Sequence, residues 1–324
     1  MTTPPRPESR RARTEVRVAA ATVLITGAAT GIGALAARSL ASRGHTVYAS
    51  MRDPDGANAK RAAALRDGGD GEIRTLELDV VDDESVDAAV GRIIEQSDRI
   101  DVLVNNAGHM YYGITEAFTP DELMSSYATN CAGAHRVTRA VLPHMRRQRE
   151  GLLLWIGSGS TRAIPPYLGP YAIAKAAFDA LAESFAWDVE SLGIDTTIIH
   201  PGVFTEGTCH FADAAQANDA ARASEYDGTP AKRHLDSMLE DTERLFSNGR
   251  SPDPQIVADE IVRIVELPSG QRPRRTVADG SDFGAEIING AAEELRIRLA
   301  RRMHITGLLG SEGRPIPPNG TLPT

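Results

Sequence analysis

Apolar runs alternate with helical patterns along most of the chain. Continuous apolar runs predict strands at Thr22–Thr26, Thr46–Ser50, Ile73–Asp79, Asp101–Asn105, Leu152–Gly157 and Ile194–His200, with a weaker one at Arg275–Ala278. Apolar residues at helical spacing predict helices at Gly31–Arg43, Glu84–Glu95, Pro120–Arg147 and Pro170–Leu192. Repeated strand–helix–strand units join parallel strands, and strands that are apolar throughout are covered on both faces. We therefore predict an α/β fold of Rossmann type: a doubly wound parallel sheet with helices on both faces.

The repeats run on without a linker rich in Pro, Gly or Ser, so we expect one domain at residues 16–302. Residues 1–15 are expected to be a disordered extension, with a cleaved transit segment as the alternative, and residues 303–324 a flexible tail. The polar, helix-prone segment 205–250 follows a strand end, where α/β proteins bind ligands. It predicts a lid-like insertion, and a solvated helical excursion with no binding role is the alternative.

Composition narrows the possible partners. The 324 residues carry a formal net charge of -9, whereas nucleic acids and anionic membranes bind basic surfaces, so neither is expected as a partner. No apolar run approaches the length of a membrane span. Cys131 and Cys209 are expected to be reduced thiols of a cytoplasmic protein, with one disulfide between them as the alternative. No metal site is expected, because no carboxylate or cysteine stands at ligand spacing from the histidines His109, His135, His144 and His200.

A glycine-rich turn lies between the first predicted strand and the first predicted helix. Gly27, Gly31 and Gly33 allow a tight turn in which backbone N–H groups and the helix N-terminus approach a phosphate. A purely structural turn is the alternative. The position of the turn after a strand and before a helix favours dinucleotide binding.

Arg52 follows the second predicted strand, where dinucleotide-binding folds meet the adenosine ribose. An arginine there pairs with the 2′-phosphate of NADP(H), whereas an acidic residue accepts from the free 2′-hydroxyl of NAD(H). Arg52 favours NADP(H), and the adjacent Asp53 keeps NAD(H) possible. An exposed loop cation is the alternative for Arg52.

Tyr171 and Lys175 stand four residues apart on a predicted helix, so their side chains share one face. The chain has only three lysines among its 35 basic residues. A neighbouring ammonium favours the phenolate and lowers the pKa of a tyrosine toward the working range. Ser158, at the end of the fifth predicted strand, has a hydroxyl suited to hold a carbonyl oxygen; alternatively it caps a turn, and Ser160 is a rival for the same role.

These motifs together resemble the short-chain dehydrogenase/reductase family, in its compact single-domain branch. The resemblance covers nearly everything between the two tails and rests on Thr26-Gly27-x-x-x-Gly31-Ile32-Gly33, Asp79 in LELDV, NNAG at Asn105–Gly108, Asn130, Ser158, Tyr171-x-x-x-Lys175 and HPGVFT at His200–Thr205. It implies a sheet of about seven parallel strands.

The resemblance also implies a role for each site residue. Tyr171 is the general acid/base, Lys175 binds the nicotinamide ribose and lowers the pKa of Tyr171, Ser158 positions the substrate oxygen, and Asn130 holds a water linked to Lys175. The cofactor is expected to be NADP(H), with NAD(H) possible, bound by Gly27, Thr30, Gly31, Ile32, Gly33, Arg52, Asp79, Val80, Asn106, Ala107, Gly108, Tyr171, Lys175, Pro201, Gly202 and Val203. Three residues depart from the family pattern: Gly157 and Ala174 are expected to be tolerated, and Thr205 is displaced, which puts its contact with the cofactor in doubt.

The expected activity is the interconversion of an alcohol and a ketone or aldehyde by hydride transfer. Aromatic and apolar residues expected at the substrate pocket indicate a hydrophobic small molecule: Met110, Tyr111, Tyr112, Tyr167, Leu168, Phe204 and Phe211. In related proteins the helices at Pro120–Arg147 and Pro170–Leu192 pack across a two-fold axis, so a homodimer or homotetramer is expected. The alternatives are a non-catalytic regulatory protein that binds the cofactor and a related chemistry such as epimerisation, which usually has another glycine spacing.

Overall fold

The computed structural model describes residues 20–246, 249–281 and 284–309. The predicted extension at residues 1–15 and most of the predicted tail at 303–324 lie outside the described residues. The strands are β1 (Thr22–Ile25), β2 (Thr46–Met51), β3 (Glu72–Glu77), β4 (Val102–Asn105), β5 (Gly151–Ile156), β6 (Ile194–Pro201) and β7 (Arg275–Ala278). The α-helices are α1 (Gly31–Ser42), α2 (Ala59–Asp67), α3 (Asp83–Ser97), α4 (Pro120–Tyr127), α5 (Gly133–Gln148), α6 (Gly169–Val189), α7 (Ala220–Ser224), α8 (Pro230–Glu243), α9 (Gln255–Glu266) and α10 (Ala285–Met303).

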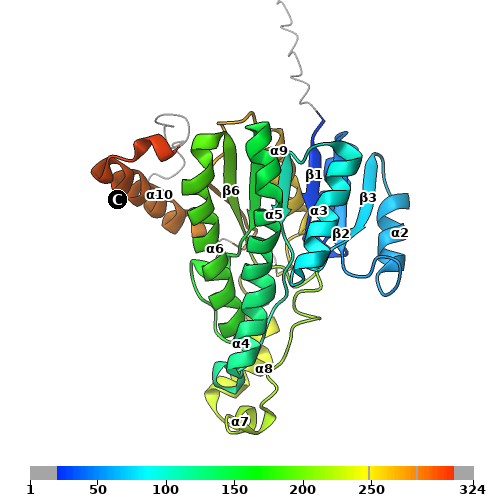
Figure 1. The fold of residues 1–324 in the computed structure, drawn as a ribbon. Coiled ribbons are helices and arrows are strands. Elements are labelled where there is room, and N and C mark those ends of the chain that lie inside the picture. Colours follow the sequence, from blue (N-terminus) through cyan, green and yellow to red (C-terminus); the bar gives the residue numbers. More distant parts are fainter. Residues whose placement is uncertain (1–19, 247–248, 282–283, 310–324) are drawn as a thin grey trace, which may run out of the picture.

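The strands form one parallel seven-stranded sheet in the order β3-β2-β1-β4-β5-β6-β7, which confirms the predicted fold (Figure 1). The chain proceeds outward from β1 to β3 and then returns to β4 on the other side of β1. Parallel sheets of this kind bind ligands beyond the carboxyl ends of the strands, at the point where the direction of winding reverses. The β1–β4 junction is therefore the expected ligand site.

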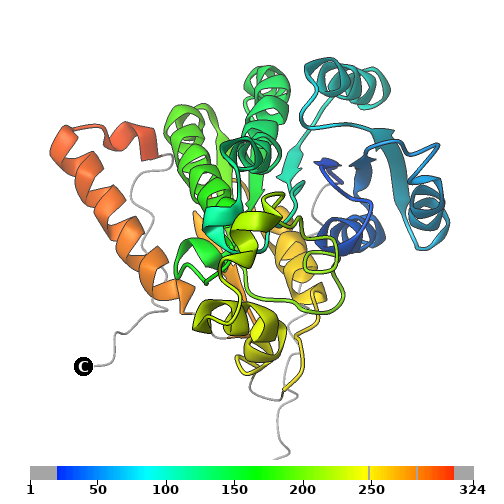
Figure 2. The same ribbon diagram turned by 90° about the horizontal axis from the view of Figure 1, so that it is seen from below.

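Two apolar layers hold helices against the two faces of the sheet (Figure 2). Successive strand residues point to opposite faces, so Val23 packs in one layer with Ile261 of α9, and Leu24 packs in the other with Val137 of α5. All four side chains are fully buried. Because each strand is covered on both faces, its sequence reads as a continuous apolar run.

The single helix predicted at Pro120–Arg147 is two α-helices separated by a π-helical turn at Ala128–Ala132. A capping box formed by Thr119 and Glu122 begins α4. The π-helical turn carries the fully buried Asn130, whose side chain hydrogen-bonds the backbone of neighbouring segments. Such turns inside helices often occur at functional sites.

Three helices were not predicted: α2, α9 and α10. Leu295 on α10 is 62% exposed, whereas Asn289 and Arg296 on the same helix are buried, which reverses the usual amphipathic pattern. Helical structure also continues past the predicted domain end at Arg302, because Thr306–Leu309 forms a 3₁₀ turn. In Figure 1, α10 lies beside α6, beyond the last strand of the sheet.

The segment predicted to be a lid contains α7 and α8 and lies at the carboxyl ends of the strands (Figure 1). A small apolar cluster that includes Met238 of α8, Phe118 and Leu168 joins it to the body. The phenol of Tyr112 donates to the carbonyl of Leu235, and that of Tyr167 donates to the carbonyl of Ala231 at 2.9 Å.

None of the helices in the described part of the chain has the length and hydropathy to cross a membrane. Among the same residues, no group of three or more His, Cys, Asp or Glu side chains is arranged to hold a metal ion. Cys131 and Cys209 are both free thiols, and Cys131 is buried.

Candidate active site

A cavity of about 580 Å³ opens at the carboxyl ends of the strands, at the expected β1–β4 junction. All of the predicted cofactor-binding residues line it, from the glycine turn at Gly27 to Pro201, Gly202 and Val203 after β6. Ser158 lines it as well, whereas Asn130 lies fully buried behind the cavity wall.

The glycine turn leads from β1 into α1. Gly27 has a φ of 67°, and a Cβ there would lie 2.8 Å from the Cα of Ala107, so only glycine fits. The N-cap residue Thr30 makes no side-chain capping bond. The N–H groups at the start of α1 therefore face the cavity with the positive end of the helix dipole, an arrangement that fits a phosphate group.

The ends of β1 and β4 are tied together below this turn. The hydroxyl of Thr26 accepts the backbone N–H groups of Asn106 and Ala107, each at 3.0 Å. The side-chain amide of Asn106 donates to the carbonyls of Thr26 and Gly27, at 2.8 Å and 3.1 Å. These bonds hold the turn in one position. The amide of Asn106 also leaves no room for a side chain at Gly33, where a Cβ would lie 2.6 Å from its nitrogen.

Two arginines line the cavity beyond β2. The sequence predicts Arg52 as a cofactor-binding residue, and the structure adds Arg61 of α2 to the lining. Asn58 connects them, because its amide donates to the carbonyl of Arg52 at 2.7 Å and its oxygen accepts from the guanidinium of Arg61 at 2.9 Å. Asp53 is the acidic residue for which the sequence leaves NAD(H) open as a cofactor, but it does not line the cavity. Its carboxylate accepts the backbone N–H of Ala57 at 2.7 Å.

A lid residue closes over the glycine turn. A Cβ at Gly31 would lie 3.6 Å from the side chain of Thr208, which also lines the cavity. The hydroxyl of Thr208 is buried and has no hydrogen-bond partner within the described residues. A buried, unpaired hydroxyl beside a phosphate-binding turn fits a bound dinucleotide. Thr205, whose role was in doubt, points its backbone N–H at Ser251 and does not line the cavity.

Tyr171 and Lys175 lie on consecutive turns of α6 and are both buried. The ammonium of Lys175 donates to the carbonyl of Ile156, at the end of β5, at 2.7 Å. It lies 6.0 Å from the ring centroid of Tyr171 and 4.7 Å from that of Phe178. Lys175 is therefore held at the strand end, within the cavity that Tyr171 lines.

Ser158 is the serine that contacts Tyr171. Its side chain interacts with the phenol of Tyr171 and favours the phenolate. The hydroxyl of Ser158 also lies 2.8 Å from that of Ser160 and accepts the backbone N–H of Ser160 at 3.2 Å. Ser160, the rival in the sequence, is thus a neighbour that holds Ser158.

Burial controls the charges in this cluster. It raises the pKa of Tyr171, and the side chain of Ser158 opposes that rise only in part. The resemblance implied a lowered pKa, so the direction in this structure is the opposite one. Burial also lowers the pKa of Lys175 to about 8, although the nearby carboxylate of Asp179 and the thiol of Cys131 oppose this.

Asn130 and Gly108 lie directly behind Lys175. The side-chain oxygen of Asn130 accepts the backbone N–H of His109 at 3.1 Å, and its amide donates to the carbonyl of Ser126 at 3.0 Å. A Cβ at Gly108 would overlap that oxygen and lie 3.9 Å from the nitrogen of Lys175. The water expected between Asn130 and Lys175 stays a prediction.

The predicted substrate residues divide into two groups. Met110, Leu168, Phe204 and Phe211 line the cavity. The three tyrosines of the prediction do not: Tyr112 and Tyr167 hold the lid through their hydroxyls, and Tyr111 donates to Ser125 at 3.1 Å.

Two histidines that no sequence motif selects, His109 and His210, line the cavity. His210 of the lid lies with its ring centroid 6.3 Å from that of Tyr171. Burial lowers its pKa to about 4, helped by the charge of Lys175, so the ring is neutral at physiological pH. The pKa of His109 is also lowered, first by burial and then by Arg52. His210 and Thr208 stand in a polar segment that carries no motif, so only the path of the lid reveals them.

A family model described as short chain dehydrogenase matches residues 21–217. The chain therefore belongs to the short-chain dehydrogenase family of oxidoreductases, as the sequence motifs indicated. The 3-ketodihydrosphingosine reductase of Bacteroides thetaiotaomicron is 37% identical over 186 residues, which cover 57% of this chain and 64% of that protein. The match thus spans slightly less than two thirds of that relative.

Solved structures agree with this assignment. A short-chain dehydrogenase from Streptomyces avermitilis superposes with a TM-score of 0.66 and 27% identity over 88% of this chain and 98% of its own. An alcohol dehydrogenase from the archaeon Thermococcus sibiricus, complexed with 5-hydroxy-NADP, has a TM-score of 0.62 and 25% identity, with 80% of this chain and 96% of its own covered.

Proposed function

We propose that this protein is an NADP(H)-preferring oxidoreductase that interconverts a hydrophobic alcohol and the corresponding ketone or aldehyde. The observation that carries the proposal is the meeting of Ser158, Tyr171 and Lys175 in one cavity whose other end is an uncapped helix N-terminus. A nicotinamide cofactor, when bound there, supplies or accepts the hydride. In folds of this class, a dinucleotide binds at the ends of the strands and at a helix N-terminus, where backbone polar groups face the ligand.

The protein's own part is to hold the substrate oxygen and to move a proton. Ser158 and Tyr171 both line the cavity and interact through their side chains, so a carbonyl oxygen bound between them would accept a hydrogen bond from each hydroxyl. In the reduction direction, the O–H bond of Tyr171 breaks as the proton passes to the carbonyl oxygen, which leaves a phenolate. The cation of Lys175 stabilises that phenolate, and the pKa of Lys175 near 8 keeps it mostly protonated at neutral pH.

The cofactor preference is supported by Arg52 and Arg61. Both residues line the cavity beyond β2, and Asn58 connects the backbone carbonyl of Arg52 with the guanidinium of Arg61. A 2′-phosphate accepts charge-assisted hydrogen bonds from such a pair. The carboxylate of Asp53, the group that would bind a free ribose hydroxyl, is occupied by the backbone of its own turn. The complex of the Thermococcus sibiricus relative with an NADP derivative agrees with this preference.

The substrate class is supported by the apolar lining at the lid end of the cavity, where Met110, Leu168, Phe204 and Phe211 gather. The relative from Bacteroides thetaiotaomicron is named for a ketone of dihydrosphingosine. Neutral His210 stands among these apolar groups and provides one hydrogen-bonding position for a polar substituent. We therefore place hydrophobic ketones that carry one such substituent first among the substrates.

The proposal is tested by cofactor binding followed by turnover. Binding of NADPH and NADH is measured by the change in nicotinamide fluorescence, and the tighter cofactor is then used with a panel of hydrophobic ketones and aldehydes. We expect NADPH to bind at least about 10-fold more tightly and at least one ketone to be reduced. Binding without turnover on any member of the panel would instead favour a regulatory protein that only binds the cofactor.

A further inference from the structure

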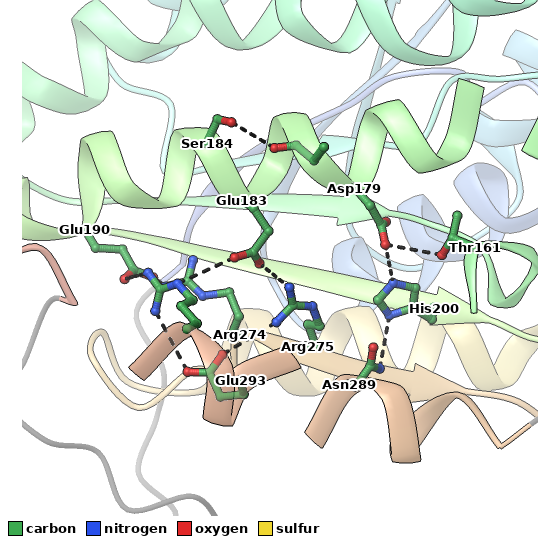
Figure 3. A network of polar contacts seen from close by, with 12 residues as sticks. Thr161, Asp179, Glu183, Ser184, Glu190, His200, Arg274, Arg275, Asn289 and Glu293 are labelled. Carbon is green, nitrogen blue, oxygen red and sulfur yellow. Dashed lines mark hydrogen bonds and ion pairs between the residues drawn. The ribbon is translucent and has the colours of Figure 1, made fainter. Parts of the chain in front are cut away.

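Behind the active site, four polar side chains from four different segments form a closed ring: Arg162, Asp179, His200 and Asn289, here called the polar ring. Arg162 follows the turn that carries Ser158, Asp179 lies on α6 one turn after Lys175, His200 lies near the end of β6, and Asn289 lies on α10. Figure 3 shows Asp179, His200 and Asn289 pointing toward one another between α6, β6 and α10. The ring does not line the cavity and is not used in the proton transfer.

Each contact in the polar ring is short. A carboxylate oxygen of Asp179 lies 2.6 Å from the guanidinium of Arg162 and 3.0 Å from Nε2 of His200. Arg162 Nε donates to the side-chain oxygen of Asn289 at 2.8 Å, and the amide of Asn289 lies 3.3 Å from Nδ1 of His200. All four side chains are at least largely buried, so solvent screens these contacts weakly.

His200 is held through both ring nitrogens. Its Nδ1 faces the amide of Asn289, whose oxygen accepts from Arg162. Its Nε2 lies 3.0 Å from the carboxylate of Asp179 and 2.8 Å from the guanidinium of Arg162. The pKa of Asp179 is lowered although burial opposes this, because His200, Arg162 and Arg275 all favour the carboxylate.

The ring reaches the catalytic groups on two sides. The hydroxyl of Thr161 lies 3.2 Å from the ring carboxylate of Asp179 and 2.9 Å from the carbonyl of Ser158. On α6, the carboxylate of Asp179 opposes the loss of charge at Lys175. A Cβ at Gly157 would lie 3.1 Å from the other oxygen of Asp179, which explains the glycine immediately before Ser158.

We propose that the polar ring is a positioning device that locks the Ser158 turn and Lys175 into one register, with α10 as its outer clamp. Asp179 is the positioning residue: it reaches the backbone of Ser158 through Thr161, and it acts on Lys175 through its charge. The inference rests on the proposed function, since it assigns Ser158 and Lys175 their catalytic roles. It predicts that the ring contacts, including the one that Asn289 makes from a C-terminal helix outside the cavity, control the rate of the chemical step.

A kinetic comparison tests the link to Ser158. Thr161→Val keeps the shape of the side chain and removes the hydroxyl, and Thr161→Ser restores the hydroxyl. We expect Thr161→Val to lower kcat at least about 10-fold because a small misplacement of a catalytic group is costly, with the KM for NADPH changed less than about 2-fold. We expect Thr161→Ser to recover most of the loss.

Glu190→Gln is the matched control. Glu190, at the far end of α6, lies beside Arg274 in Figure 3 and pairs with it. It also pairs with Arg296 of α10, and so stabilises the same α6–α10 contact without touching the polar ring. The melting temperature of the Glu190→Gln variant should fall, while its kcat should equal that of the wild type. If Thr161→Val and Glu190→Gln have equal kcat values, or if serine restores nothing, the positioning role is refuted while wild-type turnover still supports the proposed function.

A second measurement needs no turnover. The chain has only three lysines, so ¹³Cε-lysine NMR resolves the titration of Lys175. The ionisable groups facing Lys175 are Asp179 and Tyr171 of α6, Cys131 of the π-helical turn and His210 of the lid. Removing one carboxylate should lower the pKa of Lys175, so Asp179→Asn should move its titration about half a pH unit or more to lower pH.

Glu190→Gln should leave the titration of Lys175 in place. An unchanged titration in folded Asp179→Asn would contradict the inference even if the enzyme proved inactive on every substrate. Because loss of a buried charge partner can unfold a protein, circular dichroism establishes folding first. If Asp179→Asn does not fold, the comparison of Thr161→Val with Thr161→Ser decides the question.

Discussion

Burial of the Lys175 ammonium should lower the free energy of unfolding of the cofactor-free protein. The size of this loss follows from the lowered pKa of Lys175. Its pKa falls from 10.5 to about 8 on folding because its charge loses solvent. Between these values the unfolded chain binds more protons than the folded one, so stability rises with pH across this window. At about 1.4 kcal/mol per pKa unit, the penalty is about 3 kcal/mol at pH 7 and falls below about 1 kcal/mol at pH 10.

Lys175→Met removes the charge and keeps an unbranched apolar side chain. It leaves the carbonyl of Ile156 without its donor, which costs about 1–2 kcal/mol, so we expect a net gain of about 1–2 kcal/mol at pH 7 together with loss of activity. The loss at Ile156 does not depend on pH. The difference in stability between Lys175→Met and wild type should therefore shift by about 2–3 kcal/mol toward wild type between pH 7 and pH 10.

Urea denaturation measures this shift, with fluorescence of the fully buried Trp155 as the signal. Lys60→Met, which removes an exposed lysine, supplies the baseline. If the difference in the free energy of unfolding between Lys175→Met and wild type stays constant from pH 7 to pH 10, Lys175 is not a desolvated ammonium at this site.

Three further predictions concern the cavity. Arg52→Ala and Arg61→Ala should each raise the KM for NADPH about 10-fold or more and change that for NADH less than about 3-fold, as steady-state kinetics will show; equal effects on both cofactors would exclude a 2′-phosphate site. Gly108→Ala should abolish turnover because its Cβ would overlap Asn130 behind Lys175, and the result to measure is kcat in a variant shown by circular dichroism to be folded. His210 should remain neutral from pH 8 down to about pH 5, because burial holds its pKa near 4; an NMR titration with a midpoint near 6.5 would show that the lid leaves it in solvent.

The sequence predicted most of the sheet because each parallel strand, covered on both faces, is a continuous apolar run. It also predicted the cavity residues that belong to strand ends and glycine turns, where the backbone itself makes the site. The family resemblance supplied the roles of Ser158, Tyr171 and Lys175, and the structure places all three in one cavity.

What the sequence could not show depends on contacts between distant segments. Asn289 and Arg296 make α10 polar on its buried side, so the hydrophobic periodicity of this segment does not predict a packed helix. Arg61 lines the cavity from α2, which follows β2, and Thr208 lines it because the lid folds back over Gly31. The raised pKa of Tyr171 follows from burial, which spacing on a helix does not reveal.

Transfer of deuterium from [4-²H]NADPH to a ketone is the most direct test of the catalytic site. Mass spectrometry of the alcohol should find the label on the carbinol carbon with wild-type protein. It should find at least about 100-fold less labelled alcohol with Tyr171→Phe, which keeps the ring and removes the proton donor. Labelled product formed by Tyr171→Phe at the wild-type rate would contradict the assignment of Tyr171 as the acid that completes the reduction.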